Sequence, residues 1–195
     1  MMRTISCSTK RCAVFDADKA LTSIEDDLDQ LIQKTSGDAP EYPSKTILDA
    51  LDRNEDGDAH LFIEQHRGRF CYDAASRRWY TWAGHYWIKD AVNEVMKGVD
   101  DVIEIYRQEA QRRSWCKLSA EKSGEREASK KQEKLEQELI KRIRLLQSVQ
   151  RKENVLILAR TGANSLAIRG DEWDRDPWLF GCRNGIIDLR TVVSG

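Results

Sequence analysis

The stretch from Phe70 to Asp90, FCYDAASRRWYTWAGHYWIKD, limits the possible folds more than any other part of the chain. It holds three of the six tryptophans and three of the five tyrosines. Aromatic residues favour β-strands, and small residues interrupt the stretch at Ala74-Ala75-Ser76 and at Ala83-Gly84. Gly84 can supply the positive φ angle that a two-residue hairpin turn requires. The stretch therefore predicts a three-stranded antiparallel meander.

The order of the aromatic residues predicts which face of the sheet each ring occupies. Because side chains alternate along a strand, Trp79 and Trp82 point to opposite faces, whereas Tyr80 and Trp82 share one. One face has to pack on helices, since so small a sheet is not stable alone. The other face would present rings beside the guanidinium groups of Arg77 and Arg78. Bases of single-stranded DNA stack on such surfaces at about 1–3 kcal/mol per base. The alternative is a sheet covered on both faces, and the usual burial of aromatic rings favours it.

Charge and hydropathy exclude some general classes of function. The formal net charge of −1 gives no overall attraction to nucleic acid or to an anionic membrane, so any DNA contact must come from a local patch. No apolar run approaches the ~20 residues of a membrane span, and no secretory signal begins the chain, so we expect a cytoplasmic protein. The five cysteines are scattered, as is typical of a reducing compartment. Cys7 and Cys12 lack a second ligand pair, which argues against zinc.

The sequence of residues 1–54 predicts an N-terminal helical arm or extension. A helix capped by Asp16 or Asp18 runs to Lys34, with an apolar stripe opposite an acidic one. This helix is a candidate dimerisation element. Ser44 is expected to cap a second, short helix that ends at Leu51.

The next segment resembles half of a calcium-binding loop. Asp52, Asn54, Asp56 and Gly57 match the first half of the pattern, but its twelfth position, which should be glutamate, is Ile63. We therefore predict no metal and no cofactor. The preferred interpretation is a helix from Ala59 to His66, capped by Asp56 or Asp58.

Two long amphipathic helices follow the aromatic stretch. Asp90 is expected to cap the first, which would end near Trp115–Leu118 and be weakened by Gly98. The segment 121–134 is either a flexible join or exposed helical turns. A further helix from Gln132 carries a basic flank that either contacts phosphates or is a solvated face balanced by glutamates, and the interleaved acids favour the solvated face. The candidate phosphate-facing residues of this flank are Lys141, Arg142 and Arg144.

The end of the chain predicts a buried helix and a second β element. Residues 155–159 are apolar on nearly every side, and Thr161-Gly162 ends the helix. Residues 178–180 form a strand, Asn184-Gly185 a hairpin turn, and residues 186–189 the returning strand, which could pair with the meander. The expected fold is α+β: a mostly helical body with a small antiparallel aromatic β-meander and a C-terminal β-hairpin.

Two blocks of sequence together resemble a known family. The first comprises Gly57-Asp58-Ala59, then WYTWAGHYW at 79–87, then Asp90, and the second comprises DRDPWLF at 174–180 and NGIIDLRT at 184–191. They resemble the domain that precedes the superfamily-3 helicase in phage and plasmid primase–helicases and in the poxvirus primase–helicase. The resemblance covers residues 55–191 and leaves 192–195 as a tail. It departs from the family at Asp58, where asparagine is usual, and at Val192, where glycine is usual.

The resemblance implies a non-catalytic accessory domain in DNA replication that supports helicase assembly or guides DNA. The chain contains no G-x-x-x-x-G-K-[ST] phosphate-binding loop, so we expect no ATPase, and we expect the helicase domain to be absent. No catalytic constellation is evident either. The predicted DNA-binding residues are those named above: Arg77, Arg78, Trp79, Trp82, Lys141, Arg142 and Arg144. The alternative is a protein–protein interaction or oligomerisation module without DNA contact, for which a homo-oligomer is a candidate assembly.

Overall fold

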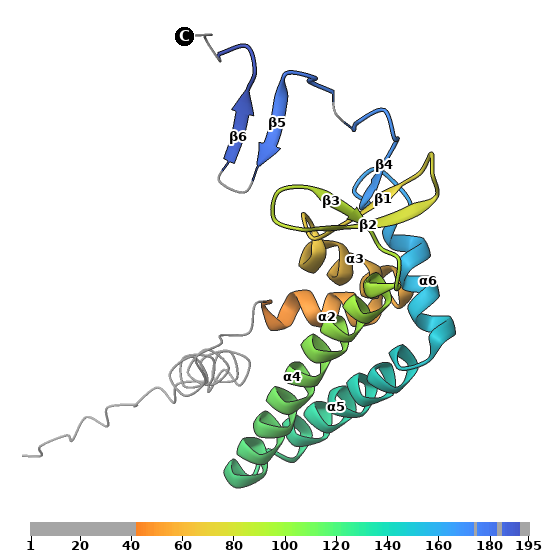
Figure 1. Cartoon of the computed structure of the whole chain (residues 1–195). Helices are drawn as coiled ribbons and strands as arrows, with labels where there is room; N and C mark the ends of the chain where they lie inside the picture. Colours follow the sequence, from red (N-terminus) through yellow and green to blue (C-terminus); the bar gives the residue numbers. More distant parts are fainter. Residues whose placement is uncertain (1–41, 174, 183–184, 192–195) are drawn as a thin grey trace, which may run out of the picture. The chain divides into compact units, whose positions relative to one another are not determined.

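The computed structural model describes residues 42–173, 175–182 and 185–191. Residues from Tyr42 onward form one compact unit, and its elements confirm an α+β fold that is mostly helical (Figure 1). The predicted helix between Asp16 and Lys34 and the Cys7–Cys12 pair lie outside the described residues. The helices are α2 (Ser44–Asp52), α3 (Glu55–His66), α4 (Glu94–Ser123), α5 (Arg126–Leu146) and α6 (Val149–Ala159). The strands are β1 (Phe70–Asp73), β2 (Arg78–Trp82), β3 (Trp87–Lys89), β4 (Ala167–Ile168), β5 (Leu179–Cys182) and β6 (Gly185–Asp188).

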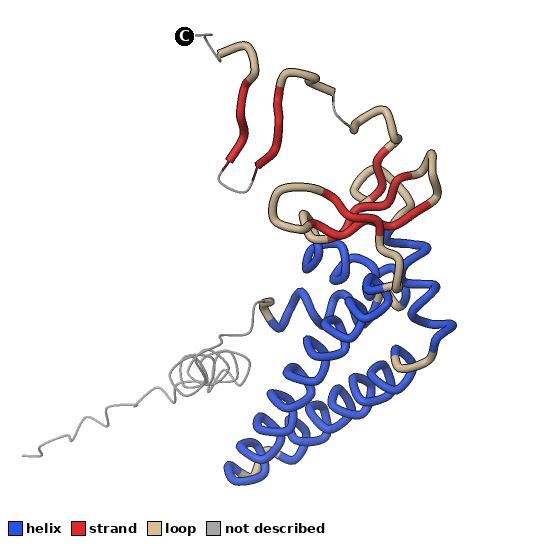
Figure 2. Tube along the Cα trace, in the orientation of Figure 1, coloured by secondary structure: helices blue, strands red, loops and turns tan. Residues whose placement is uncertain are grey.

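The predicted meander is confirmed as the antiparallel strands β1, β2 and β3 (Figure 2). Gly84 has φ +95° in the β2–β3 turn, where the amide of Ala83 donates to the carbonyl of Tyr86 at 2.9 Å. The sheet also contains β4, which pairs parallel to β1 and gives the order β3-β2-β1-β4. Strands β5 and β6 form the predicted hairpin as a separate two-stranded sheet. The expectation that this hairpin pairs with the meander is therefore wrong.

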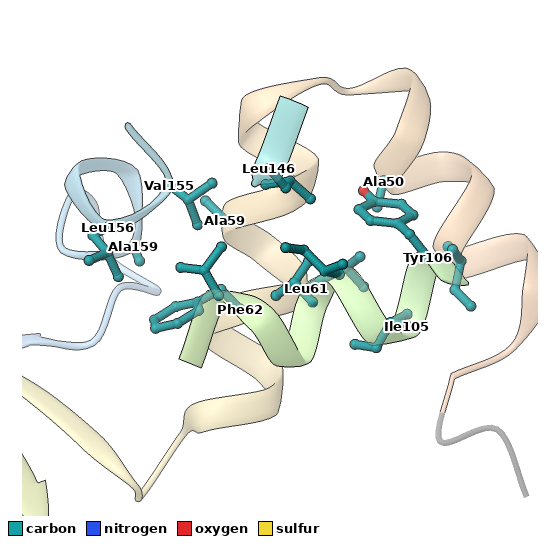
Figure 3. Close-up of a cluster of buried hydrophobic side chains, with 14 of the residues drawn as sticks. Ala50, Ala59, Leu61, Phe62, Ile105, Tyr106, Leu146, Val155, Leu156 and Ala159 are labelled. Carbon is teal, nitrogen blue, oxygen red and sulfur yellow. The ribbon is translucent and has the colours of Figure 1, made fainter. Parts of the chain in front are cut away.

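The hydrophobic core lies between the helices and one face of the sheet. All five described helices contribute to it, and the fully buried Leu61 and Phe62 of α3 lie among side chains of α4, α5 and α6 (Figure 3). Phe70 carries the core into the sheet. Helix α2 belongs to the same core through Ile47, Ala50 and Leu51, although its sequence lies within the predicted N-terminal extension.

Two glycines allow close approaches inside this core. A Cβ at Gly57 would lie 1.8 Å from the carbonyl oxygen of Ala50, so α2 and α3 cross at a distance that only glycine permits. A Cβ at Gly98 would lie 2.8 Å from a ring carbon of Phe70. Gly98 is thus a contact point between α4 and the sheet and not, as the sequence suggested, only a weak point of the helix.

Helices α4 and α5 form a long helical hairpin. The N-cap position of α4 is Asn93 and not, as predicted, Asp90, but the Asp90 carboxylate does accept hydrogen bonds from the amides of Glu94 and Val95 at 2.8 and 2.9 Å. The helix continues to Ser123, beyond the predicted end, and stops where Gly124 adopts φ +81°. The segment 121–134 is therefore helical on both sides of a short turn, which agrees with the second of its two interpretations.

A buried charge network joins α3 to α4, α5 and α6. The carboxylate of Asp58, which is 0 % exposed, accepts a hydrogen bond from the Tyr106 hydroxyl at 2.8 Å. It also pairs with Arg142 at 2.8 Å and with Arg151 at 2.8 Å. Asp58 therefore connects helices across the core and does not cap α3, which begins at Glu55. Because isolated buried charges are strongly unfavourable, these partners depend on one another.

Ser44 likewise differs from its predicted capping role. It is the first residue of α2, and its hydroxyl donates to the buried carboxylate of Glu109 at 2.6 Å. Among the described residues, no helix is long and apolar enough to cross a bilayer.

Candidate nucleic-acid interface

The pairing register assigns each side chain of the meander to a face. Tyr72 lies opposite Trp79, and Phe70 opposite Thr81, so these four side chains share the face that meets the core. We call this the inner face. The outer face is formed by the alternate residues, which are Cys71 and Asp73 of β1, Arg78, Tyr80 and Trp82 of β2, and Trp87 and Lys89 of β3.

Aromatic rings form a continuous row on the outer face. Trp82 and Trp87 are cross-strand partners with ring centroids 5.2 Å apart. Trp173, from the segment after β4, lies 6.4 Å from Trp87 and 5.1 Å from Tyr80 by the same measure. Trp173 was not among the predicted site residues, because a single tryptophan in the acidic run GDEWDRD gives no strand or helix signal.

The segment that carries Trp173 passes close to Asp73. Hydrogen bonds to the Asp73 carboxylate, chiefly from the Ser76 side chain and also from Trp173, lower its pKa. Gly170 allows the chain to pass close by: its φ is +86°, and a Cβ there would lie 2.6 Å from that of Ala75. Trp173 therefore lies over the sheet through its ring contacts, at the end of a segment that Gly170 lets pass close to Asp73 and Ala75.

Basic side chains flank the row of rings. Arg78 and Lys89 are exposed on the outer face, and Trp82 is 41 % exposed. Arg77 is exposed in the turn before β2, where its φ is +56°. Within the described part of the chain, no carboxylate forms an ion pair with any of these basic groups. Their charges are thus available to an anionic ligand such as a phosphate backbone.

The structure separates the other predicted DNA-binding residues from this face. Trp79 lies on the inner face, half-buried against the core, so it cannot stack on a base without a change of the sheet. Lys141 and Arg144 are exposed on α5, which lies away from the sheet at the other side of α4 (Figure 1). Arg142 is buried beneath them, held by Asp58 and by the backbone carbonyls of Leu51 and Asn54 at 2.9 Å.

Arg142 lies in the core, which corrects the prediction that this side chain faces phosphates. A charged residue was interpreted as exposed because its partner Asp58 is 84 residues away in the sequence. The DNA-binding role of Arg77, Arg78, Trp82, Lys141 and Arg144 stays a prediction.

The hairpin of β5 and β6 presents a second exposed surface. Phe180 pairs with Ile187, and the amide of Leu189 donates to the carbonyl of Trp178 at 2.7 Å, so these four side chains share one face. Their exposed fractions range from 43 to 61 %. Arg190 closes one end of the hairpin by pairing with Asp176 and Asp188 at 3.1 and 2.8 Å.

Cys71 is a buried cysteine beside acidic residues. Burial, together with the nearby charges of Asp73 and Glu172, raises the pKa of Cys71 to about 11, which keeps the thiol protonated. Across the described ranges, no group of three or more histidines, cysteines and carboxylates is placed to hold a metal ion.

Together, the helical body, the four-stranded sheet and the aromatic row define a domain with an exposed, ring-lined surface that carries basic side chains. The model of the family described as D5 N terminal like matches residues 59–194. Because the match spans well over half of the sequence, the chain belongs to this family, the N-terminal region of phage and viral primase–helicases. No curated protein and no solved structure was found to match the chain.

Proposed function

We propose that this chain is a non-catalytic accessory domain of a phage- or plasmid-type primase–helicase in DNA replication. Its role is to engage DNA, preferably single-stranded, for the helicase. The observation that carries the proposal is the outer face of the sheet, where the rings of Trp82 and Trp87 lie between exposed basic side chains. The family match supports the replication context.

The chemistry of the outer face suits single-stranded DNA. Every base has an aromatic surface that can stack on an exposed tryptophan, whatever the sequence, and Trp82 is the most exposed ring of the row. Arg78 and Lys89 lie on the same face and can contact phosphates on either side of a stacked base. Because the net charge of the chain is −1, binding depends on this local arrangement and should be weak and sensitive to salt.

Fluorescence anisotropy with a labelled oligothymidine at low salt tests the proposal. Trp82→Ala should weaken binding by roughly 5- to 150-fold, which corresponds to the loss of about 1–3 kcal/mol of stacking. Trp115→Ala is the matched control, because Trp115 is 63 % exposed on α4, outside the sheet. Equal affinities of the parent and the Trp82 variant would refute a role of this face in DNA binding.

A charge variant tests the basic groups separately. The slope of log affinity against log salt concentration is negative, and each phosphate contact to a single strand contributes about 0.7 to its magnitude. In the double variant Arg77→Ala, Arg78→Ala, this magnitude should therefore decrease by about 1.4. The corresponding change at Lys141 and Arg144 shows whether α5 contributes as well. An unchanged slope in both variants would contradict the proposal.

The hairpin favours a second candidate function, which is docking of a helicase domain without DNA contact. Its apolar face contains Trp178, Phe180, Ile187 and Leu189. Within the described residues, β5 and β6 pair only with each other. Exposed apolar surfaces of this kind are typical of interaction sites. Co-elution with a superfamily-3 helicase domain of the same replication system tests it. Loss of co-elution in Phe180→Asp, with DNA affinity unchanged, would favour docking as the primary role.

A further inference from the structure

The four-stranded sheet ends in two edge strands, the two-residue β4 and the longer β3. The order β3-β2-β1-β4 places β3 at the end, and among the described residues no strand pairs with its far side. Open edges present unpaired amides and carbonyls and are sites where a further strand can add. Proteins protect such edges or use them for assembly.

The hydrogen bonds of β3 show which backbone groups point outward. The amide of Asp90 donates to the carbonyl of Trp79, and the amide of Ala83 to the carbonyl of Tyr86. In this register Thr81 and Ile88 form the hydrogen-bonded pair between them, because such pairs alternate along an antiparallel ladder. The amides and carbonyls of Trp87 and Lys89 therefore point away from β2, at the open edge.

We propose that β3 pairs with β3 of a second copy of this chain, antiparallel about a two-fold axis at Ile88. In that register Trp87 lies opposite Lys89 of the second copy, and Lys89 opposite its Trp87. Both are the residues whose backbone groups point outward, so each of these pairs can exchange two hydrogen bonds. The two four-stranded sheets become one continuous sheet, and the interface is self-complementary, as a two-fold contact requires.

The side chains at this edge are complementary in charge and shape. A lysine commonly protects an edge strand from pairing, because two lysines would repel each other. Here the register sets each Lys89 beside a Trp87 on the outer face, where an ammonium group over an indole is attractive. On the inner face the two Ile88 side chains meet at the axis, beside an open groove of about 250 Å³ that Val92 and Trp82 also line.

The exposed apolar area sets the strength of the contact. Ile88 and Val92 are 45 and 81 % exposed, and the half-buried Trp87 lies beside them. With Lys89 these side chains cover roughly half of the ~800 Å² that each partner contributes to a standard stable interface. The dimer is therefore weak and forms only at high protein concentration. It does not require DNA, but Trp87 and Lys89 belong to both surfaces, so its tests are made without DNA.

Two experiments on the full chain test the proposal. In analytical ultracentrifugation from 10 to 500 µM without DNA, the parent should show a monomer–dimer equilibrium, and Ile88→Lys should shift it toward monomer at least tenfold. The apolar-to-lysine control is Val149→Lys, which lies on α6 and is 66 % exposed in the parent. It should leave the equilibrium unchanged. A parent that is monomeric throughout, or an association that Ile88→Lys does not weaken, would overturn the proposal.

Disulfide cross-linking supplies a readout that does not depend on the stability of the lysine variant. Directly opposite residues in a non-hydrogen-bonded antiparallel pair have Cα atoms about 4.5 Å apart, which a disulfide can span. Under mild oxidation, Ile88→Cys should give a covalent dimer whose linked peptides both contain position 88. Val149→Cys and the parent, which carries its own cysteines, should not give this species. Failure of Ile88→Cys to cross-link at 200 µM would also overturn the proposal.

Discussion

Replacing Asp58 with asparagine tests whether the buried charge network holds the helices together. The substitution keeps the size of the side chain and an oxygen that can accept from Tyr106, but it removes the negative charge between Arg142 and Arg151. Arg151 retains its contact with Glu55 at 2.7 Å. Arg142 loses its carboxylate partner and keeps only carbonyl contacts, although its side chain is just 10 % exposed.

The expected loss in the free energy of unfolding follows from the loss of the carboxylate partner of Arg142. Removing one partner of a buried ion pair costs about 3–5 kcal/mol, and the retained carbonyl bonds of Arg142 place the value near the lower end, at about 3 kcal/mol. With a urea m-value of about 2 kcal/mol per molar, the midpoint of unfolding should fall by roughly 1.5 M. Circular dichroism during urea titration measures it.

A control and a double variant make the result specific. Asp100→Asn removes an ion pair to Lys152 in which Asp100 is 55 % exposed, so it should cost less than about 1 kcal/mol. Combining Asp58→Asn with Arg142→Met should cost less than the sum of the two single changes by about 1–3 kcal/mol. If Asp58→Asn shifts the midpoint no more than Asp100→Asn does, the network does not stabilise the fold and the reasoning is wrong.

Two further predictions concern single positions near the sheet. Gly98→Ala should lower Tm by roughly 2–8 °C in calorimetry, because overpacking against Phe70 outweighs the helix preference of alanine; an unchanged or higher Tm would show that the ring can move aside. For Cys71, the folded-state pKa of about 11 exceeds the reference value of 9.0, so its contribution to stability is complete below pH 9 and is lost as the pH rises through about 11. The unfolding free energy of the parent should therefore fall more steeply over that range than that of Cys71→Ala, and equal slopes would contradict the pKa shift.

The sequence predicted the meander well because its signals are local. Aromatic density, the break at Ala74–Ser76 and the single Gly84 lie within one short window, and strand alternation correctly separated Trp79 from Trp82. Strand β4 could not be predicted in the same way. It contains two residues, and it forms a strand only because Tyr72 and Asp73 offer a partner far earlier in the chain.

Long-range contacts also explain the errors in the helices and in the candidate site. Helix α4 continues through a polar segment because α5 packs along it, and no local apolar pattern records this support. Arg142 looked like a surface residue because its carboxylate partner is distant in the sequence. Trp173 joins the aromatic row through ring contacts with Tyr80 and Trp87, and its acidic neighbours in the sequence conceal that position.

The parallel pairing of β4 with β1 has a consequence for how the protein is made. The amides of Tyr72 and Ala74 donate to the carbonyls of Leu166 and Ile168, so β1 keeps an open side until the chain has been synthesised past residue 168. A nascent chain on the ribosome would therefore hold a nearly complete helical core beside an unfinished sheet. Such late long-range pairing of β4 with β1 slows folding and leaves unpaired backbone groups of β1 exposed, so that this strand can aggregate with neighbouring nascent chains. Translation pauses or chaperone capture in the interval before that residue would thus affect the yield of soluble protein more than pauses elsewhere.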